Sequence, residues 1–122
     1  MDNAICKTNM LECEPMIEVS NQHDLNTQLA SNSRVLALFH ASWCPFCRSF
    51  VAIFDKHAKN PGKDTFIKVR IDEDENPLWE IYELDAVPSI ILFENGQVKR
   101  RLDCHLGAGL NEKQFTHWLA SP

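Results

Sequence analysis

The chain has 122 residues, which is the length of one domain with a single hydrophobic core. Hydrophobic residues make up 44% of the sequence and charged residues 24%, values that are typical of a globular protein and exclude a disordered one. The formal net charge of −5 excludes the basic surface with which proteins bind nucleic acids or anionic membranes. No run of about 18 apolar residues occurs, and residues 1–7 lack the parts of a signal peptide. We therefore expect a cytoplasmic protein without a membrane span.

The five cysteines are an odd number, which does not suit a small secreted domain stapled by disulfides. Cys44 and Cys47 form a CxxC pair, whereas Cys6, Cys13 and Cys104 stand alone in the sequence. A structural zinc site needs four ligands, usually from two paired clusters, and no second CxxC or HxxxH pair is present. We therefore expect no metal and no cofactor, and we interpret the CxxC pair as a redox site.

Hydrophobic periodicity and turn residues predict the elements of the chain. Residues 1–15 show no periodicity and are expected to form a loosely ordered arm before one domain over residues 16–122. Strands are predicted at 16–19, 35–40, 65–71, 89–93 and 97–102, and helices at 21–30, from about 44 to 60, at 78–84 and from 111. The order β-α-β-α-β-α-β-β-α predicts an α/β fold, with a central mixed sheet flanked by helices.

Several short motifs refine this prediction. Asn76-Pro77 predicts a helix N-cap followed by proline at the first helical position, and Asn95-Gly96 predicts a tight hairpin. The stretch Asn111-Glu112-Lys113-Gln114 is similar to a capping box at the start of the last helix. The acidic run 72–75 is interpreted as a solvated turn rather than a calcium loop, since it lacks the glycine and the alternate spacing of ligands that such a loop requires.

The cysteine pair lies between the apolar runs 35–39 and 50–54, where a buried strand leads into a helix. Pro45 suits the first helical position, which places Cys44 at the helix N-terminus. There, unpaired N–H groups and the helix dipole favour a negatively charged sulfur. We therefore predict Cys44 as a nucleophile and Cys47 as the thiol that resolves its adduct. The same helix is expected to present one apolar stripe, made of Phe46, Phe50, Ile53, Phe54 and His57.

Three motifs together resemble the thioredoxin superfamily over about residues 16–120: Trp43-Cys44-Pro45-Phe46-Cys47, Val87-Pro88 and Phe93-Glu94-Asn95-Gly96. The resemblance implies the thioredoxin fold, with Pro88 in the cis form facing the cysteines. It also implies that the backbone of Val87 is free to pair with an extended substrate peptide. The docking surface around Cys44 would then consist of Trp43, Pro45, Phe46, Ala86, Val87 and Pro88.

The sequence departs from thioredoxins at three places. Thioredoxins carry Gly-Pro between the two cysteines, whereas Pro45-Phe46 is more similar to glutaredoxins. Leu38 stands where thioredoxins and protein disulfide isomerases carry a buried acid. Cys104 falls near a small residue, usually Gly, that follows the last strand of thioredoxins. The chain thus resembles a thioredoxin body with a glutaredoxin-like motif.

The resemblance implies a protein disulfide oxidoreductase in which the Cys44 thiolate attacks a substrate disulfide and Cys47 releases the reduced product. Its partners would be protein disulfides and an electron donor, either a thioredoxin-reductase-like enzyme or glutathione, and we expect a monomer. One alternative is a glutathione-dependent enzyme that uses Cys44 alone and holds glutathione through Ser89 and Arg48, although Asp85 is unfavourable beside them. Another is a non-catalytic binding module with this fold, which the intact cysteine pair argues against.

Two further residues are candidate modulators of the site. His40 shares a strand face with Leu38 and lies nearer to the cysteines, so it could accept the proton that Cys47 must lose; the alternative is that His40 only packs. Cys104 could be a modulatory thiol near the pair, or a small buried residue that fills the usual glycine position.

Overall fold

The computed structural model describes residues 17–59, 64–104 and 109–120. The elements in these residues are β1 (Ile17–Val19), α1 (Gln22–Ser31), β2 (Arg34–His40), α2 (Pro45–Ala58), β3 (Thr65–Arg70), α3 (Leu78–Ile81), β4 (Ser89–Glu94), β5 (Gln97–Asp103) and α4 (Glu112–Ala120). This order confirms the predicted α/β fold. The predicted arm, residues 1–15, and the predicted stop of the second helix at 60–62 lie outside the described residues. No helix in the described segments is long and apolar enough to cross a bilayer.

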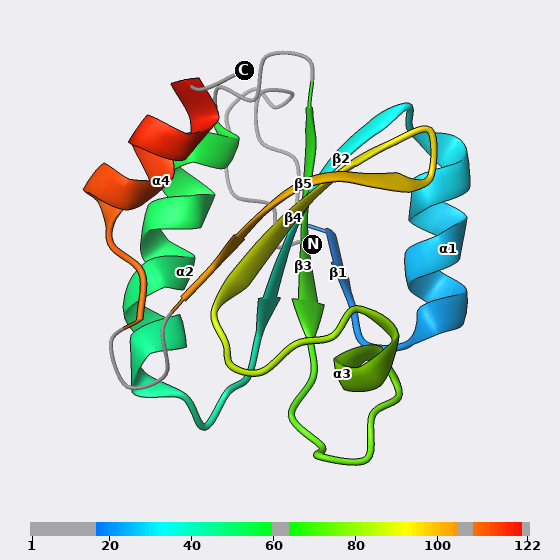
Figure 1. Cartoon of the computed structure of the whole chain (residues 1–122), viewed down its shortest axis with the longest axis horizontal. Coiled ribbons are helices and arrows are strands. Elements are labelled where there is room, and N and C mark those ends of the chain that lie inside the picture. Colours follow the sequence, from blue (N-terminus) through cyan, green and yellow to red (C-terminus); the bar gives the residue numbers. More distant parts are fainter. Residues whose placement is uncertain (1–16, 60–63, 105–108, 121–122) are drawn as a thin grey trace, which may run out of the picture.

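The five strands form one sheet in the order β1-β3-β2-β4-β5. β1, β3 and β2 run parallel, whereas β4 is antiparallel to both β2 and β5. β2 is therefore the central strand, and it is buried from Val35 to His40. Figure 1 shows helices on both faces of the sheet, with α2 and α4 on one side and α1 and α3 on the other.

The side chains of β2 alternate between two halves of the core, because successive residues of a strand point to opposite faces. Val35, Ala37 and Phe39 join the cluster that contains Leu25 and Leu29 of α1. The intervening residues of β2 join a second cluster with α2 and α4, which contains Leu36, Leu38, Phe50, Phe54 and Phe115. The near-continuous apolar run in β2 is thus explained by burial on both faces.

Local hydrogen bonds explain most helix and turn boundaries. Asn21 caps α1 by accepting from the N–H of Asp24 at 2.8 Å. Asn111 and Gln114 exchange reciprocal bonds of 2.8 and 2.9 Å, so the predicted capping box at α4 is confirmed. In the hairpin between β4 and β5, Asn95 and Gly96 both have positive φ, 53° and 81°, as a primed two-residue turn requires.

The predicted extent of the third helix, residues 78–84, is wrong. α3 ends at Ile81, because Glu83 takes a φ of 52° and the N–H of Leu84 bonds back to the carbonyl of Trp79 at 2.8 Å. The predicted cap is wrong as well: Pro77 is the N-cap residue of α3, and Asn76 before it accepts from the N–H of Leu78 at 3.0 Å.

The strand directions bring four connections to one end of the sheet. β2 and β3 are parallel, so both strands finish at this end, as does β5, while the antiparallel β4 begins there. The segments found at this end are the turn before Cys44, the turn at Asp72, the Val87–Pro88 peptide and Cys104. These four connections contain most of the predicted site residues.

Candidate functional site

Cys44 is the N-cap of α2, and Pro45 occupies the first helical position as predicted. The Cys44 sulfur accepts a hydrogen bond from the backbone N–H of Cys47 at 3.2 Å. The Cys44 thiol also lies 3.5 Å from the carbonyl oxygen of Val87, to which it can donate. This sulfur therefore lies at a helix N-terminus and next to the connection that enters β4.

Cys47 lies one turn inside α2, and only 1% of its surface is exposed. Burial raises the pKa of the Cys47 thiol, and the nearby Cys44 raises it further. Cys44 is 5% exposed and has a backbone N–H donor on its sulfur, whereas burial disfavours the thiolate of Cys47. The two sulfurs are thus adjacent but chemically unequal.

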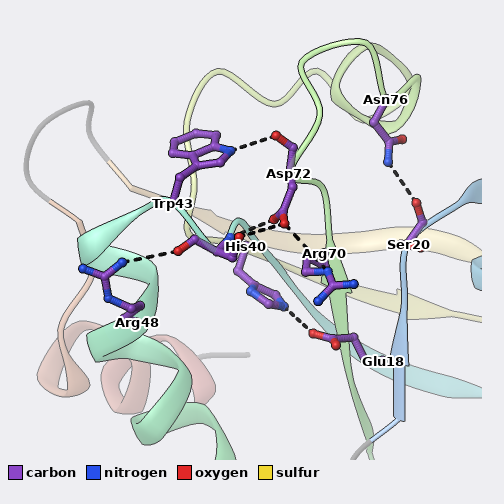
Figure 2. A network of polar contacts seen from close by, with 9 residues as sticks. Glu18, Ser20, His40, Trp43, Arg48, Arg70, Asp72 and Asn76 are labelled. Carbon is purple, nitrogen blue, oxygen red and sulfur yellow. Dashed lines mark hydrogen bonds and ion pairs between the residues drawn. The ribbon is translucent and has the colours of Figure 1, made fainter.

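The turn before Cys44 is held by Asp72, which follows β3. The Asp72 carboxylate accepts from both the N–H and the hydroxyl of Ser42, each at 2.8 Å, and the Asp72 carbonyl accepts from the indole N–H of Trp43 at 2.8 Å. The Ser42 N–H lowers the pKa of Asp72. Arg48 adds a bond of 3.3 Å to the carbonyl of Ser42, and Figure 2 shows these contacts around the turn.

Asp72 is a residue that the sequence interpretation missed, because the run 72–75 was assigned to a solvated turn. Residues 73–75 are exposed in that turn, whereas Asp72 is partly exposed and bonds to Ser42, a role that the interpretation did not include. The strand register carries the signal that could have revealed it. His40 pairs with Arg70 in the parallel ladder, so the residues two positions further along, Ser42 and Asp72, leave the sheet side by side.

Two aromatic side chains stand exposed beside the cysteines. Trp43 is 54% exposed and Phe46 is 42% exposed, and Pro45 between the cysteines is exposed as well. Of the apolar stripe expected on α2, Phe50 and Phe54 are buried, whereas Phe46 is exposed. Phe46 lies in the first turn of α2, at this end of the sheet.

Phe46 rests against Gly109, another residue that the sequence interpretation missed. A β-carbon placed on Gly109 would lie 2.7 Å from Cδ1 of Phe46, closer than such atoms approach, and the φ of Gly109 is +71°. Both the backbone conformation and the aromatic contact therefore require glycine at this position. In the sequence, Gly109 is recognisable only as a glycine before the last helix, and no motif predicts its contact with Phe46.

The Val87–Pro88 peptide bond is cis, as the resemblance implied. Val87 and Pro88 are buried and Ala86 is partly exposed, so this connection presents mainly backbone to the surface. Among the described residues, the N–H of Val87 has no hydrogen-bond partner. The connection lies next to Cys44 through the contact between the Cys44 sulfur and the Val87 carbonyl.

His40 is turned toward β1 rather than engaged with the thiols. Its Nε2 lies 2.9 Å from a carboxylate oxygen of Glu18, as Figure 2 shows. Burial lowers the pKa of His40, and the Glu18 carboxylate opposes this effect. No hydrogen bond joins His40 to either cysteine within the described residues, so its role as a proton acceptor stays a prediction.

Leu38, which stands in place of a buried acid, is itself fully buried. Its partner across the ladder is Lys68, whose ammonium lies 3.3 Å from the carboxylate of Asp55 on α2. Lys68 is therefore paired with a carboxylate from α2, and not with an acid at position 38 of β2.

Cys104 follows β5 and is half-buried, in contact with the α2 and α4 half of the core. It also lines a pocket of about 340 Å³ together with Ala86 and Ser89. Burial raises the pKa of Cys104, and charge on Cys44 raises it further. The structure therefore places the third thiol near the cysteine pair.

The residues considered for holding glutathione are engaged elsewhere. The Ser89 hydroxyl donates to the Ala86 carbonyl at 2.9 Å, and Ser89 is almost fully buried. Arg48 donates to the carbonyl of Ser42. The adjacent pocket is lined by the acidic Glu83, Asp85 and Asp103, and Arg101, which also lines it, is paired with Asp103. Glu83 and Asp85 have no ion-pair partner in the described part of the chain, so they would repel the carboxylates of glutathione. Within the described segments, no group of three His, Cys, Asp or Glu side chains is placed to hold a metal.

Comparisons with known proteins agree with this geometry. The family model described as Thioredoxin matches residues 16–120. A thioredoxin of Chlamydia pneumoniae is 32% identical over 100 residues, which cover 82% of this chain and 91% of that protein. A thioredoxin of Mycoplasmoides gallisepticum is 31% identical over 83 residues, which cover 68% of this chain and 82% of that protein. A solved structure of Plasmodium falciparum thioredoxin has a TM-score of 0.73 and 24% identity, and the match covers 85% of this chain and 96% of that one.

Proposed function

Because the chain belongs to the thioredoxin family and is a protein disulfide oxidoreductase, we propose that Cys44 and Cys47 are its redox pair, with Cys44 as the attacking sulfur. The observation that carries this assignment is the position of the Cys44 sulfur at the N-terminus of α2, where it accepts the N–H of Cys47. Such a donor and the helix dipole stabilise a thiolate. Cys47 lacks this advantage, since burial raises its pKa.

In the reductive direction, the Cys44 thiolate attacks one sulfur of the substrate disulfide. A mixed disulfide forms with Cys44, and the other substrate sulfur leaves as a thiolate. Cys47 then loses its proton and attacks the Cys44 sulfur, so that the second substrate thiol is released and a Cys44–Cys47 disulfide remains. Two electrons pass to the substrate, and a reductant must return them to the protein.

We propose that the substrate docks as an extended segment along Ala86, Val87 and Pro88. The N–H of Val87 is available for a strand-like hydrogen bond, and its carbonyl already lies beside the Cys44 sulfur. The exposed rings of Trp43 and Phe46, with Pro45, supply apolar surface next to Cys44. Docking by backbone and flat apolar contacts suits substrates of varied sequence.

A thioredoxin-reductase-like enzyme is the electron donor that this site favours over glutathione. Ser89 and Arg48 are engaged in internal hydrogen bonds, and Glu83 and Asp85 make the adjacent pocket acidic. A monomer in the cytoplasm completes the proposal. The monomer is supported by the exposed apolar side chains of the described part: except for Trp43 and Phe46, they are scattered over the surface. The cytoplasm is supported by the odd cysteine count, which suits a reducing compartment.

The test is turnover of a protein disulfide with two electron supplies, namely a bacterial thioredoxin reductase with NADPH, and glutathione with glutathione reductase. We expect faster turnover with thioredoxin reductase, and loss of turnover both in Cys44→Ser and in a double variant with Cys47→Ser and Cys104→Ser, which leaves Cys44 without a neighbouring thiol among the described residues. Turnover by glutathione that survives in the double variant would instead establish the mechanism that uses Cys44 alone. Activity that survives Cys44→Ser would overturn the assignment of the nucleophile.

A further inference from the structure

Cys104 lies opposite the docking connection. In the β4 and β5 ladder, Ser89 pairs with Asp103, so Cys104 leaves the sheet at the level of Pro88. Val87, the next residue back along the chain, has its carbonyl 3.5 Å from the Cys44 sulfur. The ladder therefore brings Cys104 to the same end of the sheet as Cys44, with the Val87–Pro88 connection between them.

Cys104 and the two sulfurs of the proposed redox pair influence one another electrostatically. Charge on Cys44 contributes to the raised pKa of Cys104, and charge on Cys104 contributes to the raised pKa of Cys47. The three thiols of the described residues are therefore neighbours in one site, although Cys104 lies 57 positions beyond Cys47 in the sequence.

Cys104 is more accessible than the assigned resolving thiol. Cys47 is 1% exposed inside α2, whereas Cys104 is half-buried and forms part of a pocket of about 340 Å³. Ala86 and Ser89, which flank the docking dipeptide, line the same pocket. Core packing explains the buried part of Cys104, but a pure filler of the core would not line a pocket beside the docking segment.

From this placement, and resting on the proposed function, we propose that Cys104 is a second resolving thiol, which can attack the Cys44 sulfur of the mixed disulfide in place of Cys47. The Cys44–Cys104 bond forms and the bond between Cys44 and the substrate sulfur breaks. Cys104 gives up its proton, and the departing substrate thiolate takes one up. The substrate gains two electrons and the Cys44–Cys104 pair loses two, as in resolution by Cys47.

Cys47 can then attack the Cys44 sulfur of the new disulfide. The Cys44–Cys47 bond forms and Cys104 returns to a thiol, so this exchange involves no further oxidant or reductant. The overall reaction is the same by either route. Cys104 supplies the step when Cys47, which is only 1% exposed inside α2, is slow to react.

The test uses two chains that lack the other competing cysteines. The first carries Cys6→Ser, Cys13→Ser and Cys47→Ser, and the second carries Cys104→Ser in addition. Each reduced protein is mixed with one equivalent of dithiobis-nitrobenzoate, which leaves a nitrothiobenzoate adduct on the attacking cysteine. The adduct is isolated at once, and mass spectrometry verifies that it lies on Cys44. Release of the coloured nitrothiobenzoate thiolate is then followed over time.

We expect first-order release at a rate independent of protein concentration when Cys104 is present. The adduct should last at least about tenfold longer with Cys104→Ser, because a tethered thiol acts at an effective concentration of about millimolar or more. After digestion with trypsin, the product should contain peptide 35–48 linked by a disulfide to peptide 102–113. Cys104→Ala must lengthen the lifetime as Cys104→Ser does, and near-ultraviolet circular dichroism verifies that each chain is folded.

Equal adduct lifetimes with and without Cys104, and no linked peptide, would overturn the role of Cys104 while leaving the redox pair intact. Failure of Cys44 to form an adduct at all would overturn the proposed function, and this inference with it. The two failures are thus separated at different stages of one experiment.

Discussion

The carboxylate of Asp72 accepts both the backbone N–H and the hydroxyl of Ser42 at 2.8 Å. This contact joins the turn that follows β3 to the turn that leads from β2 into Cys44. The Asp72 carbonyl also holds the indole of Trp43, so one residue fixes two consecutive positions before the attacking sulfur. Asp72 is therefore a positioning residue for the turn, although it touches neither cysteine.

Replacement of Asp72 by alanine should weaken both the fold and the site. We expect a loss of about 1 kcal/mol in the free energy of unfolding, since the hydrogen bonds to Ser42 are partly exposed. Release of Trp43 should raise KM for a protein disulfide more than it lowers kcat. Asp74→Ala, in the same acidic turn but exposed, is the matched control and should change neither quantity. Equal effects of the two substitutions would contradict the positioning role.

Gly109→Ala is expected to displace Phe46 from its place beside the cysteines. The added β-carbon would lie 2.7 Å from the ring, and the positive φ would cost about 1 kcal/mol or more in stability. Gly96→Ala is the control, because Gly96 also has positive φ but nothing lies within 4 Å of an added β-carbon. Both variants should lose stability in denaturant titrations, but only Gly109→Ala should raise KM. Unchanged KM in both would show that Phe46 does not contact the substrate.

His40 should make stability depend on pH below 6.5. Burial lowers the pKa of His40 from 6.5 in the folded protein, so the unfolded chain binds a proton at a higher pH than the native chain. The free energy of unfolding should therefore fall as pH drops below 6.5, and His40→Phe should remove this slope. Asp72, with a pKa lowered from 3.8, loses its contribution only in more acidic solution. An identical slope in wild type and His40→Phe, measured by denaturant titration, would contradict this expectation.

The same variant tests whether His40 accepts the proton of Cys47. A relay predicts slower resolution and a shifted acidic limb in the pH profile of disulfide reduction by His40→Phe, with the initial attack by Cys44 less affected. The hydrogen bond of His40 to Glu18 favours the packing alternative, for which the two profiles superimpose. Stopped-flow measurement of attack and resolution as separate phases distinguishes these outcomes.

Trp43 should report the redox state by its fluorescence, because it directly precedes Cys44 and is exposed. Emission is expected to change when dithiothreitol reduces the protein, and Trp43→Phe should remove most of the change. Trp79 donates to the carbonyl of Glu73, and Trp118 packs beneath Arg100, so both should respond little. A full signal in Trp43→Phe would assign the change to one of these two residues.

The fold could be predicted from the sequence because local signals and burial agree in most elements. The apolar run of β2, the Asn95-Gly96 turn and the box formed by Asn111 and Gln114 each specify one structure. α3 was overestimated because residues 82–84 fit a helix pattern, whereas the left-handed conformation of Glu83 is invisible in the sequence.

Only those site residues that belong to a sequence motif could be predicted from the sequence. Cys44, Cys47 and Pro88 follow from sequence motifs, but Asp72 acts through a contact between strands and could be found only from the register of β2 and β3. The contact of Phe46 with Gly109 joins segments far apart in the chain, and no spacing in the sequence encodes it.

The unequal reactivity of Cys44 and Cys47 underlies the proposed reaction, and competitive alkylation of the reduced protein measures it. Brief treatment with limiting iodoacetamide, followed by fragmentation of the tryptic peptide 35–48, gives the label on each cysteine separately. We expect Cys44 to be labelled first, because its sulfur lies at the start of α2, whereas burial raises the pKa of Cys47. Faster labelling of Cys47 would contradict the assignment of Cys44 as the attacking sulfur.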